Sequence, residues 1–361
     1  MLNEVAARHV QRKFNVTQPE ISSGAVRIAR DARGARTSYD DLEIGKDLGS
    51  TEFVFTQLEI DQTCARLKDH HPYYELNSPL GGTVCPVYMT YWLTRMLFSE
   101  TYSVRGLFYK WGFELFEPVR PGVKYSLSGR LTEKWIKNDR EFVSYESVCK
   151  DPQGKLVFTT RRAHTLDFIK RTAPKSGENG IDSSDARSPT AKAARVRVWE
   201  PADWVDGTSA AGTGNAVVRP LANADMPAGT PLPSISVFFS QQEFERRWKP
   251  RKAGANRTLH IEPDAAKQEG LPAPVAGAPD IMALLFRSAL HFFGVGWIQG
   301  GKAELTSSRP TFPGDYLTTG GVVRDREMLA DGSTRLICDV WIENQAGEKK
   351  VVGTIGGIAP H

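Results

Sequence analysis

The sequence lacks an apolar run long enough to cross a membrane. Its longest apolar helical pattern, at 279–293, is interrupted by Arg287, well short of the roughly 20 residues that span a bilayer. The N-terminus, MLNEVAARHVQRKF, carries charges where a secretory signal needs an uninterrupted apolar stretch. We therefore expect a cytoplasmic protein with no membrane partner, while the Arg-containing, acid-poor first 36 residues leave a mitochondrial address open.

Cysteines are few and are not paired in the sequence. Cys64, Cys85, Cys149 and Cys338 form no CxxC motif, and no histidine stands at metal-ligand spacing from them. Structural zinc sites need such closely spaced ligands. We expect no metal, no cofactor, and free buried thiols in a reducing compartment.

The charge balance selects no class of partner. Lys and Arg number 46 and Asp and Glu 42, a net charge of +4, which suits an anionic small ligand as well as nucleic acid. The basic stretch RRWKPRK at 246–252 has a single Trp, whereas single-strand binders have several spaced aromatics on which bases stack. Nucleic acid is therefore not an expected partner.

Length and composition predict two domains. A chain of 361 residues exceeds what one ordinary core organises. Pro, Gly, Ser and charged residues replace alternating apolar ones at 170–197, and a second loose stretch follows at 207–234. The predicted parts are an N-terminal arm at 1–38, a domain at 39–170, a linker and excursion at 171–234, and a domain at 235–361.

The two predicted domains repeat the same order of parts. Each has an apolar segment that opens with proline, PVYMTYWLTRMLF at 86–98 and PDIMALLFRSALHFF at 279–293, followed by alternating, strand-like segments. Proline favours the first turn of a helix, and a helix that is apolar on nearly every face has to be buried. The order predicts one buried helix and an antiparallel meander in each half.

The turn glycines of the two halves recur at matching intervals. Gly122 and Gly154 are 32 residues apart, and Gly314 and Gly347 are 33 apart. Matching order and interval favour a duplication, although a common β-meander can produce the turn spacing by itself. A sheet wrapped around its helix is the hotdog arrangement, so we expect an α+β double hotdog with one continuous sheet.

Several segments in this order resemble the MaoC-like double-hotdog family of (R)-specific enoyl-thioester hydratases and 3-hydroxyacyl dehydratases. They are SYDDLEIGKDL at 38–48, KDHHPYY at 68–74, FEPVRPGVKY at 116–125 and NRTLHIEPDAAKQEGLPAPVAG at 256–277. The resemblance implies a metal-free hydro-lyase that adds water to, or removes it from, an acyl thioester of coenzyme A or of a carrier protein.

The family loop D-x-N-P-x-H matches this chain only at His260. Counting back, the family Asp falls on Ala255 and the Asn on Arg257, while Thr258 replaces Pro. A one-residue adjustment places Asn256 at the acidic position, where an amide can orient water but cannot accept its proton. The resemblance implies that His260 is both base and acid and that Asn256 orients water, although Asn256 also suits a turn cap.

Four further residues are candidates for substrate binding. Gly277 and Ala278 open a helix whose free N–H groups and positive dipole end can receive the thioester oxygen, and Gly277 leaves room for close approach. Arg257 and the basic residues at 247–252 are expected near the pocket mouth, where they are candidates for the phosphates of coenzyme A or pantetheine, although a solvated basic loop explains them equally. Tyr74, at the position of the catalytic His in the first-half loop, is expected to line the acyl chain.

Two other functions stay open. Hotdog thioesterases place a carboxylate near the central helix, and Asp280 stands at the start of this one, where acids also favour the helix dipole. The missing family Asp is compatible with a non-catalytic acyl-thioester-binding scaffold. A direct role for Asp69 or His70 of the first-half loop and formation of a homodimer are left open as well.

Overall fold

The computed structural model describes residues 37–102, 104, 106–166, 221–248, 259–268 and 271–360. The strands of the first half are β1 (Asp47–Phe53), β2 (Phe108–Leu115), β3 (Tyr125–Lys137), β4 (Arg140–Lys150) and β5 (Leu156–Thr165). Its helices are α4 (Gln57–Leu67), α5 (Tyr91–Thr101) and the short 3₁₀ helices η1 (Pro72–Tyr74) and η2 (Val87–Thr90).

The second half has the same kinds of element. Its strands are β6 (Ser236–Phe238), β7 (Lys302–Ser307), β8 (Tyr316–Met328), β9 (Thr334–Glu343) and β10 (Lys349–Ala359). Its helices are α6 (Gln241–Trp248), α7 (Pro263–Gln268), α8 (Ala278–Phe293) and α9 (Val295–Ile298).

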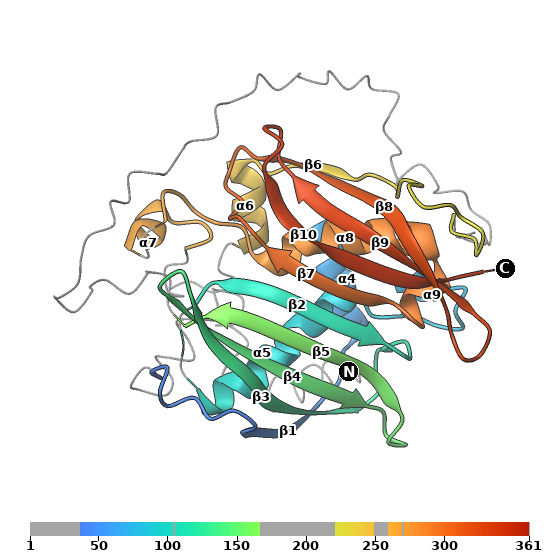
Figure 1. The fold of residues 1–361 in the computed structure, drawn as a ribbon, viewed down its shortest axis with the longest axis horizontal. Coiled ribbons are helices and arrows are strands. Elements are labelled where there is room, and N and C mark those ends of the chain that lie inside the picture. Colours follow the sequence, from blue (N-terminus) through green and yellow to red (C-terminus); the bar gives the residue numbers. More distant parts are fainter. Residues whose placement is uncertain are drawn as a thin grey trace.

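Within the described ranges the strands form one antiparallel sheet of ten, in the order β1-β3-β4-β5-β2-β7-β10-β9-β8-β6. Strands β2 and β7 pair at its centre, with Gly112 opposite Glu304, and from there each half continues outward in the same order of equivalent strands (Figure 1). The sheet therefore repeats about its central pair, as the duplicated sequence pattern predicts.

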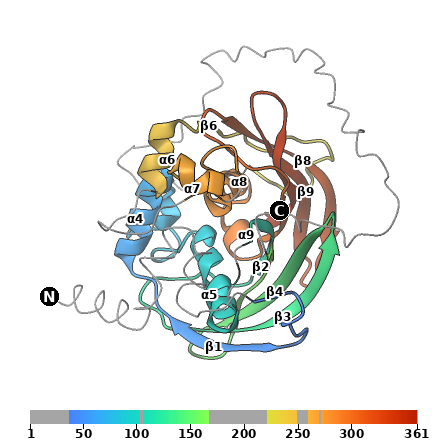
Figure 2. The same cartoon turned by 90° about the vertical axis from the view of Figure 1, so that its left-hand side faces the viewer.

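The two apolar segments form the buried helices. Thirteen of the sixteen residues of α8 are buried, and both α5 and α8 lie in the hollow of the curved sheet (Figure 2). The second helix follows the predicted range closely. The first one begins as η2 at Val87 and becomes α-helical only at Tyr91, so proline at the opening does not by itself decide between 3₁₀ and α geometry.

One hydrophobic core runs through both halves. Phe286 of α8 meets Trp111 and Phe113 of β2 edge-on, with ring centroids 5.3 Å apart in each pair. Such aromatic pairs add about 0.5–1.5 kcal/mol each beyond the area that they bury. Helix α8 of the second half therefore packs against β2, the first-half strand of the central pair.

The predicted turns join the strands as expected. The Gly154 N–H donates to Asp151 O between β4 and β5, and the Gly347 N–H donates to Asn344 O between β9 and β10. Both glycines have positive φ, 81° and 74°, a conformation that glycine adopts without the steric cost of a Cβ atom.

The predicted linker lies largely outside the described residues, as does the N-terminal arm, so the domain boundaries stay a prediction. The described end of the linker packs on the second half. The Ala222 N–H donates to Phe292 O, and the Leu232 N–H donates to Gly321 O. These contacts hold the described end of the linker, at 221–234, against the second half.

All four cysteines are free and buried, as the sequence predicts. Within the described residues no cluster of His, Cys, Asp and Glu is arranged to hold a metal ion. In the same part of the chain, no helix is both long enough and apolar enough to cross a membrane.

Candidate active site

His260 lies in the turn at 259–261, directly before α7. The preceding residue, Leu259, is buried together with Val275, and Phe312 packs against this pair. The Val275 N–H also donates to Leu259 O at 3.1 Å. Apolar packing and a backbone hydrogen bond thus hold the histidine turn against the segment that leads into α8.

The His260 ring is oriented by a backbone carbonyl. Its Nδ1 lies 2.5 Å from Val275 O, and a carbonyl oxygen can only accept, so Nδ1 carries the proton of the neutral ring. The basic nitrogen is then Nε2. The contact sets the tautomer that a general base needs.

The surroundings of His260 favour its neutral form. Burial lowers the pKa of its imidazole below the ordinary value of 6.5, while the hydrogen bond to Val275 and the negative charge of Asp280 act in the opposite direction. A neutral imidazole is able to take a proton from water at neutral pH. The same effect means that the ring titrates at a lower pH than an unperturbed histidine does.

Gly277 and Ala278 lie at the start of α8. Gly277 is the N-cap in an extended conformation, with φ −67° and ψ 125°, and its carbonyl accepts from the N–H groups of Asp280 and Ile281. The first N–H groups of a helix have no acceptor within it, and they form the positive end of the helix dipole. Gly277 and Ala278 carry the N–H groups at this end of the helix, two and three positions beyond Val275, whose carbonyl orients His260.

Asp280, the candidate thioesterase carboxylate, is already engaged. It is buried, and its Oδ2 accepts from Arg66 Nη1 of α4 at 2.5 Å. Asp280 also interacts electrostatically with the positive charge of Arg247. Asp280 therefore has two cationic neighbours, which is the arrangement of a structural ion pair.

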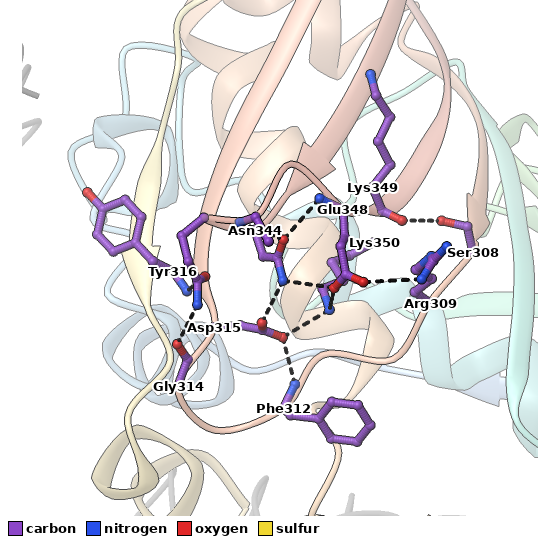
Figure 3. Close-up of polar contacts among 12 residues, drawn as sticks. Ser308, Arg309, Phe312, Gly314, Asp315, Tyr316, Asn344, Glu348, Lys349 and Lys350 are labelled. Atoms are coloured by element: carbon purple, nitrogen blue, oxygen red, sulfur yellow. Dashed lines mark hydrogen bonds and ion pairs between the residues drawn. The ribbon is translucent and has the colours of Figure 1, made fainter. Parts of the chain in front are cut away.

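A buried ion cluster supports the segment beside α8 (Figure 3). Lys350 Nζ lies 3.3 Å from Asp315 Oδ2, which also accepts from the Phe312 N–H at 2.9 Å. The neighbouring carbonyl, Thr311 O, accepts from the Ala276 N–H at 2.9 Å. The cluster thus fixes a turn that contacts both the histidine loop, through Phe312, and the start of α8, through Thr311.

The structure places His260 against Val275, two positions before Gly277 and three before Ala278, and it leaves two predicted site residues undecided. Asn256 and Arg257 lie outside the described residues, so their roles stay predictions. Among the basic residues expected at the pocket mouth, Arg247 is buried, donates to Glu243 and lies over the Phe239 ring. It is therefore occupied within the protein and does not face phosphate groups in solvent.

Tyr74 lies in η1 of the first half and is buried. Burial raises the pKa of its phenol well above the ordinary value, and the charges of Asp69 and Cys64 raise it further, while Arg287 of α8 opposes them. Its polar neighbours come from its own half and from α8. A role in lining the acyl chain stays a prediction.

Sequence reasoning did not identify the residues that orient and surround His260. Val275 acts through its main-chain carbonyl, which leaves no signal in residue type. Arg66 pairs with Asp280, which is 214 positions away in the sequence. No motif in the sequence of α4 indicated that Arg66 would pair with a residue of α8.

No protein-family model matches the chain, and no curated protein matches it either. Solved structures match over most of its length. A MaoC-like dehydratase covers 90% of this chain and 100% of its own, with a TM-score of 0.63 and 17% identity. A MaoC domain dehydratase from Chloroflexus aurantiacus covers 90% and 98%, with a TM-score of 0.59 and 11% identity.

A third similar structure is a conserved hypothetical protein from Mycobacterium tuberculosis described as a double hotdog fold. It covers 90% of this chain and 98% of its own, with a TM-score of 0.53 and 15% identity. Likeness at such low identity establishes the fold and leaves the reaction open. The chain has the double hotdog fold of the MaoC-like dehydratases, and the predicted fold class is confirmed.

Proposed function

We propose that this double hotdog protein is a hydro-lyase that adds water to a 2-enoyl thioester or removes it from the 3-hydroxyacyl product. The observation that carries the proposal is the contact of His260 Nδ1 with Val275 O at 2.5 Å. This contact makes Nε2 the basic nitrogen, and it supports His260 as the single residue that takes and returns the proton. The MaoC-like dehydratases with the same fold support this reaction class.

In the proposed hydration, His260 Nε2 takes a proton from water while the water oxygen bonds to Cβ of the substrate. The electron pair of the double bond moves toward the carbonyl, whose oxygen gains negative charge and is held by N–H groups at Gly277 and Ala278. The protonated His260 then returns the proton to Cα. Hydroxyl and hydrogen are thereby added across the double bond, and the histidine regains its neutral form.

Three further contacts complete the proposal. Asn256 orients the water or the β-hydroxyl, Arg257 binds phosphate of coenzyme A or of a carrier protein's pantetheine arm, and Tyr74 lines the acyl chain. The reaction needs no electron transfer, and acid–base catalysis with oxyanion stabilisation is sufficient for it.

A crotonyl thioester distinguishes this function from its alternatives. Loss of the enoyl absorbance without release of free thiol is the expected result. Thiol release would instead favour a thioesterase that uses Asp280, although the ion pair of that carboxylate with Arg66 argues against it. Neither change, with binding retained, would identify a non-catalytic acyl-thioester scaffold.

A further inference from the structure

Lys350 of β10 and Asp315, the residue before β8, form a buried ion pair (Figure 3). Lys350 Nζ lies 3.3 Å from Asp315 Oδ2, and the two side chains are 4% and 11% exposed. Asn344 Nδ2 donates to the other carboxylate oxygen, Oδ1, at 2.9 Å. Replacing a buried ion pair by apolar residues of similar volume is often neutral or stabilising. Stability by itself therefore gives no reason for two charges at this place.

The first half has valines at the two equivalent positions. Asp315 follows Pro-Gly in FPGDY, and Val123 follows Pro-Gly in RPGVKY. Lys350 and Val157 each lie three residues after the turn glycine of their half, and each of their carbonyls accepts from two consecutive main-chain N–H groups. The two halves thus form the same backbone with different side chains at these positions.

The frame around the histidine turn also recurs in the two halves. In the second half the Val275 N–H donates to Leu259 O at 3.1 Å, and in the first half the Val84 N–H donates to Tyr73 O at 2.9 Å. The residue after the acceptor is His260 in the second half and a tyrosine in the first. The ion pair therefore belongs to the half with the histidine, and the other half builds the same frame without it.

The ion pair reaches the histidine turn through Phe312. Asp315 Oδ2 accepts from the Phe312 N–H at 2.9 Å, and the Phe312 side chain packs against Leu259 and Val275. Leu259 precedes His260 in the chain, and Val275 O lies 2.5 Å from His260 Nδ1. The carboxylate thus fixes a side chain that supports both the histidine turn and the carbonyl that orients the ring.

The first half closes the same turn without a charge. The Arg120 N–H, at the position of the Phe312 N–H, donates to the Tyr125 hydroxyl at 2.9 Å. Hydrogen bonds to an ionised acceptor are shorter and roughly twice as strong as neutral ones. Asp315 therefore holds its turn more firmly than closure of the turn requires.

The turn that Asp315 holds also contacts the start of α8. Thr311 O accepts from the Ala276 N–H at 2.9 Å, and Ala276 precedes Gly277, the N-cap of α8. Firm placement of this one turn therefore acts on the base and on the proposed oxyanion donors together.

We propose that Asp315 and Lys350 are positioning residues, which hold His260 in the orientation that the proposed hydration needs. The inference rests on the proposed function, because it names the groups that place the general base. Lys350 fixes the Asp315 carboxylate, the carboxylate fixes Phe312, and Phe312 supports Val275 beside the histidine turn. A shift of about 1 Å in a reacting group lowers a rate by up to about 100-fold, so a loose turn is costly even when the fold is intact.

The double variant Asp315→Val/Lys350→Val gives the second half the side chains of the first. Glu348 keeps Arg309 and Asn344 as partners, so the variant leaves neither charge of the pair buried alone. We expect the full chain to unfold in urea at a midpoint close to that of the wild type. We expect kcat for the crotonyl thioester to fall about 10- to 100-fold, with KM changed by less than about 3-fold.

The tautomer of His260 is read by ¹⁵N NMR of the histidine rings, without any assay of turnover. Its signals are assigned by their loss in His260→Ala. We expect the proton on Nδ1 in the wild type and shared between Nδ1 and Nε2 in the double variant, because Val275 O is then no longer held against the ring. Asp315→Asn, which keeps an oxygen for the Phe312 N–H, is expected to show smaller changes in the tautomer and in kcat.

Arg324→Val/Asp339→Val is the matched control, because it removes an ion pair of the same half whose side chains are 50% and 46% exposed. We expect its kcat and its His260 tautomer to equal those of the wild type. An equal loss of kcat in this control overturns the proposal. So does a folded Asp315→Val/Lys350→Val variant that retains either the wild-type tautomer or the wild-type kcat.

Two further outcomes are decided in the same experiment. If the double variant does not fold, Asp315→Asn decides, and a wild-type tautomer with wild-type kcat in that variant is the contrary result. If the wild-type protein does not hydrate the thioester, the proposed function fails by itself, and the tautomer of His260 in the double variant still decides whether the ion pair positions the ring.

Discussion

Arg66 of α4 and Asp280 of α8 form an ion pair that joins the two halves, with 2.5 Å between Nη1 and Oδ2. A second pair runs in the reverse direction, from Arg287 of α8 to Asp69 just beyond α4, at 3.6 Å. Each half thus gives one arginine to one aspartate of the other. The pairs fix the start of α8, where the proposed oxyanion donors lie, relative to the first half.

Replacing Arg66 by Met is expected to destabilise the protein. Asp280 would remain buried with its main partner removed, and breaking a buried pair costs about 3–5 kcal/mol. The Arg66 side chain is 25% exposed, so we expect about 3 kcal/mol in urea unfolding at neutral pH. Lys124→Met is the control, because the side chains of Lys124 and its partner Glu52 are 57% and 50% exposed. Ion pairs that are this exposed contribute about 0–1 kcal/mol. Equal losses in the two variants would contradict a special role for the Arg66 pair.

His260→Ala is expected to lower kcat/KM for enoyl-thioester hydration by at least about 100-fold, the usual contribution of general acid–base catalysis. Asn256→Ala should lower it less, because it removes an orienting group and not a proton acceptor. Absorbance assays on both variants measure this. Near-normal hydration by His260→Ala would contradict the assignment of His260 as the general base and acid. Loss of activity in Asp280→Asn, with thiol release intact in His260→Ala, would move the protein to the hydrolase interpretation.

The pH dependence of hydration is expected to show one ascending limb with its midpoint below 6.5. Burial lowers the pKa of His260 from that ordinary value, and the base is active only when neutral. The rate should therefore rise as pH increases through the lowered pKa and stay level above it. Initial rates of kcat/KM between about pH 4 and 8 measure the limb. A midpoint above 6.5 would mean that another group controls the proton transfer.

Gly277→Val is expected to weaken substrate binding while leaving the fold intact. With φ −67° and ψ 125°, the backbone at this position is accessible to valine, so no conformational strain is introduced. The branched side chain would occupy space next to the proposed oxyanion donors. We expect kcat/KM to fall at least about 10-fold, which is about 1.4 kcal/mol, with thermal unfolding little changed and Gly277→Ala intermediate. Unchanged substrate affinity would place the pocket elsewhere.

The protein is expected to lose stability as pH falls below 6.5, in part through His71. Its folded pKa is about 3 and its unfolded value 6.5, so between these values the unfolded chain binds a proton that the folded chain does not. Stability is therefore complete above pH 6.5 and declines as pH decreases toward 3. At pH 5 this contribution reaches about 2 kcal/mol. Urea unfolding of wild type and His71→Phe at pH 7 and pH 5 measures it, and an identical pH dependence in a folded variant would refute the assignment.

The sequence by itself determined the duplicated architecture. Proline-led apolar segments specify helices that have to be buried, and alternating strands with turn glycines at matched intervals specify the sheet around them. These signals are local, because each depends on residues within one element or one turn. The sequence also named His260, Gly277 and Ala278 as candidates for one site, and that assignment stays a prediction.

Only the tertiary structure decided how the site is tuned. The tautomer of His260 depends on the carbonyl of Val275, and any residue type could supply that carbonyl. The engagement of Asp280 depends on Arg66, which is 214 positions away, and Arg247 is buried although its basic neighbours suggested a solvated face. Hydrogen bonds and ion pairs are set by distances in space, and separation along the chain does not encode those distances. The burial that shifts the pKa values of His260 and His71 likewise exists only in the folded chain.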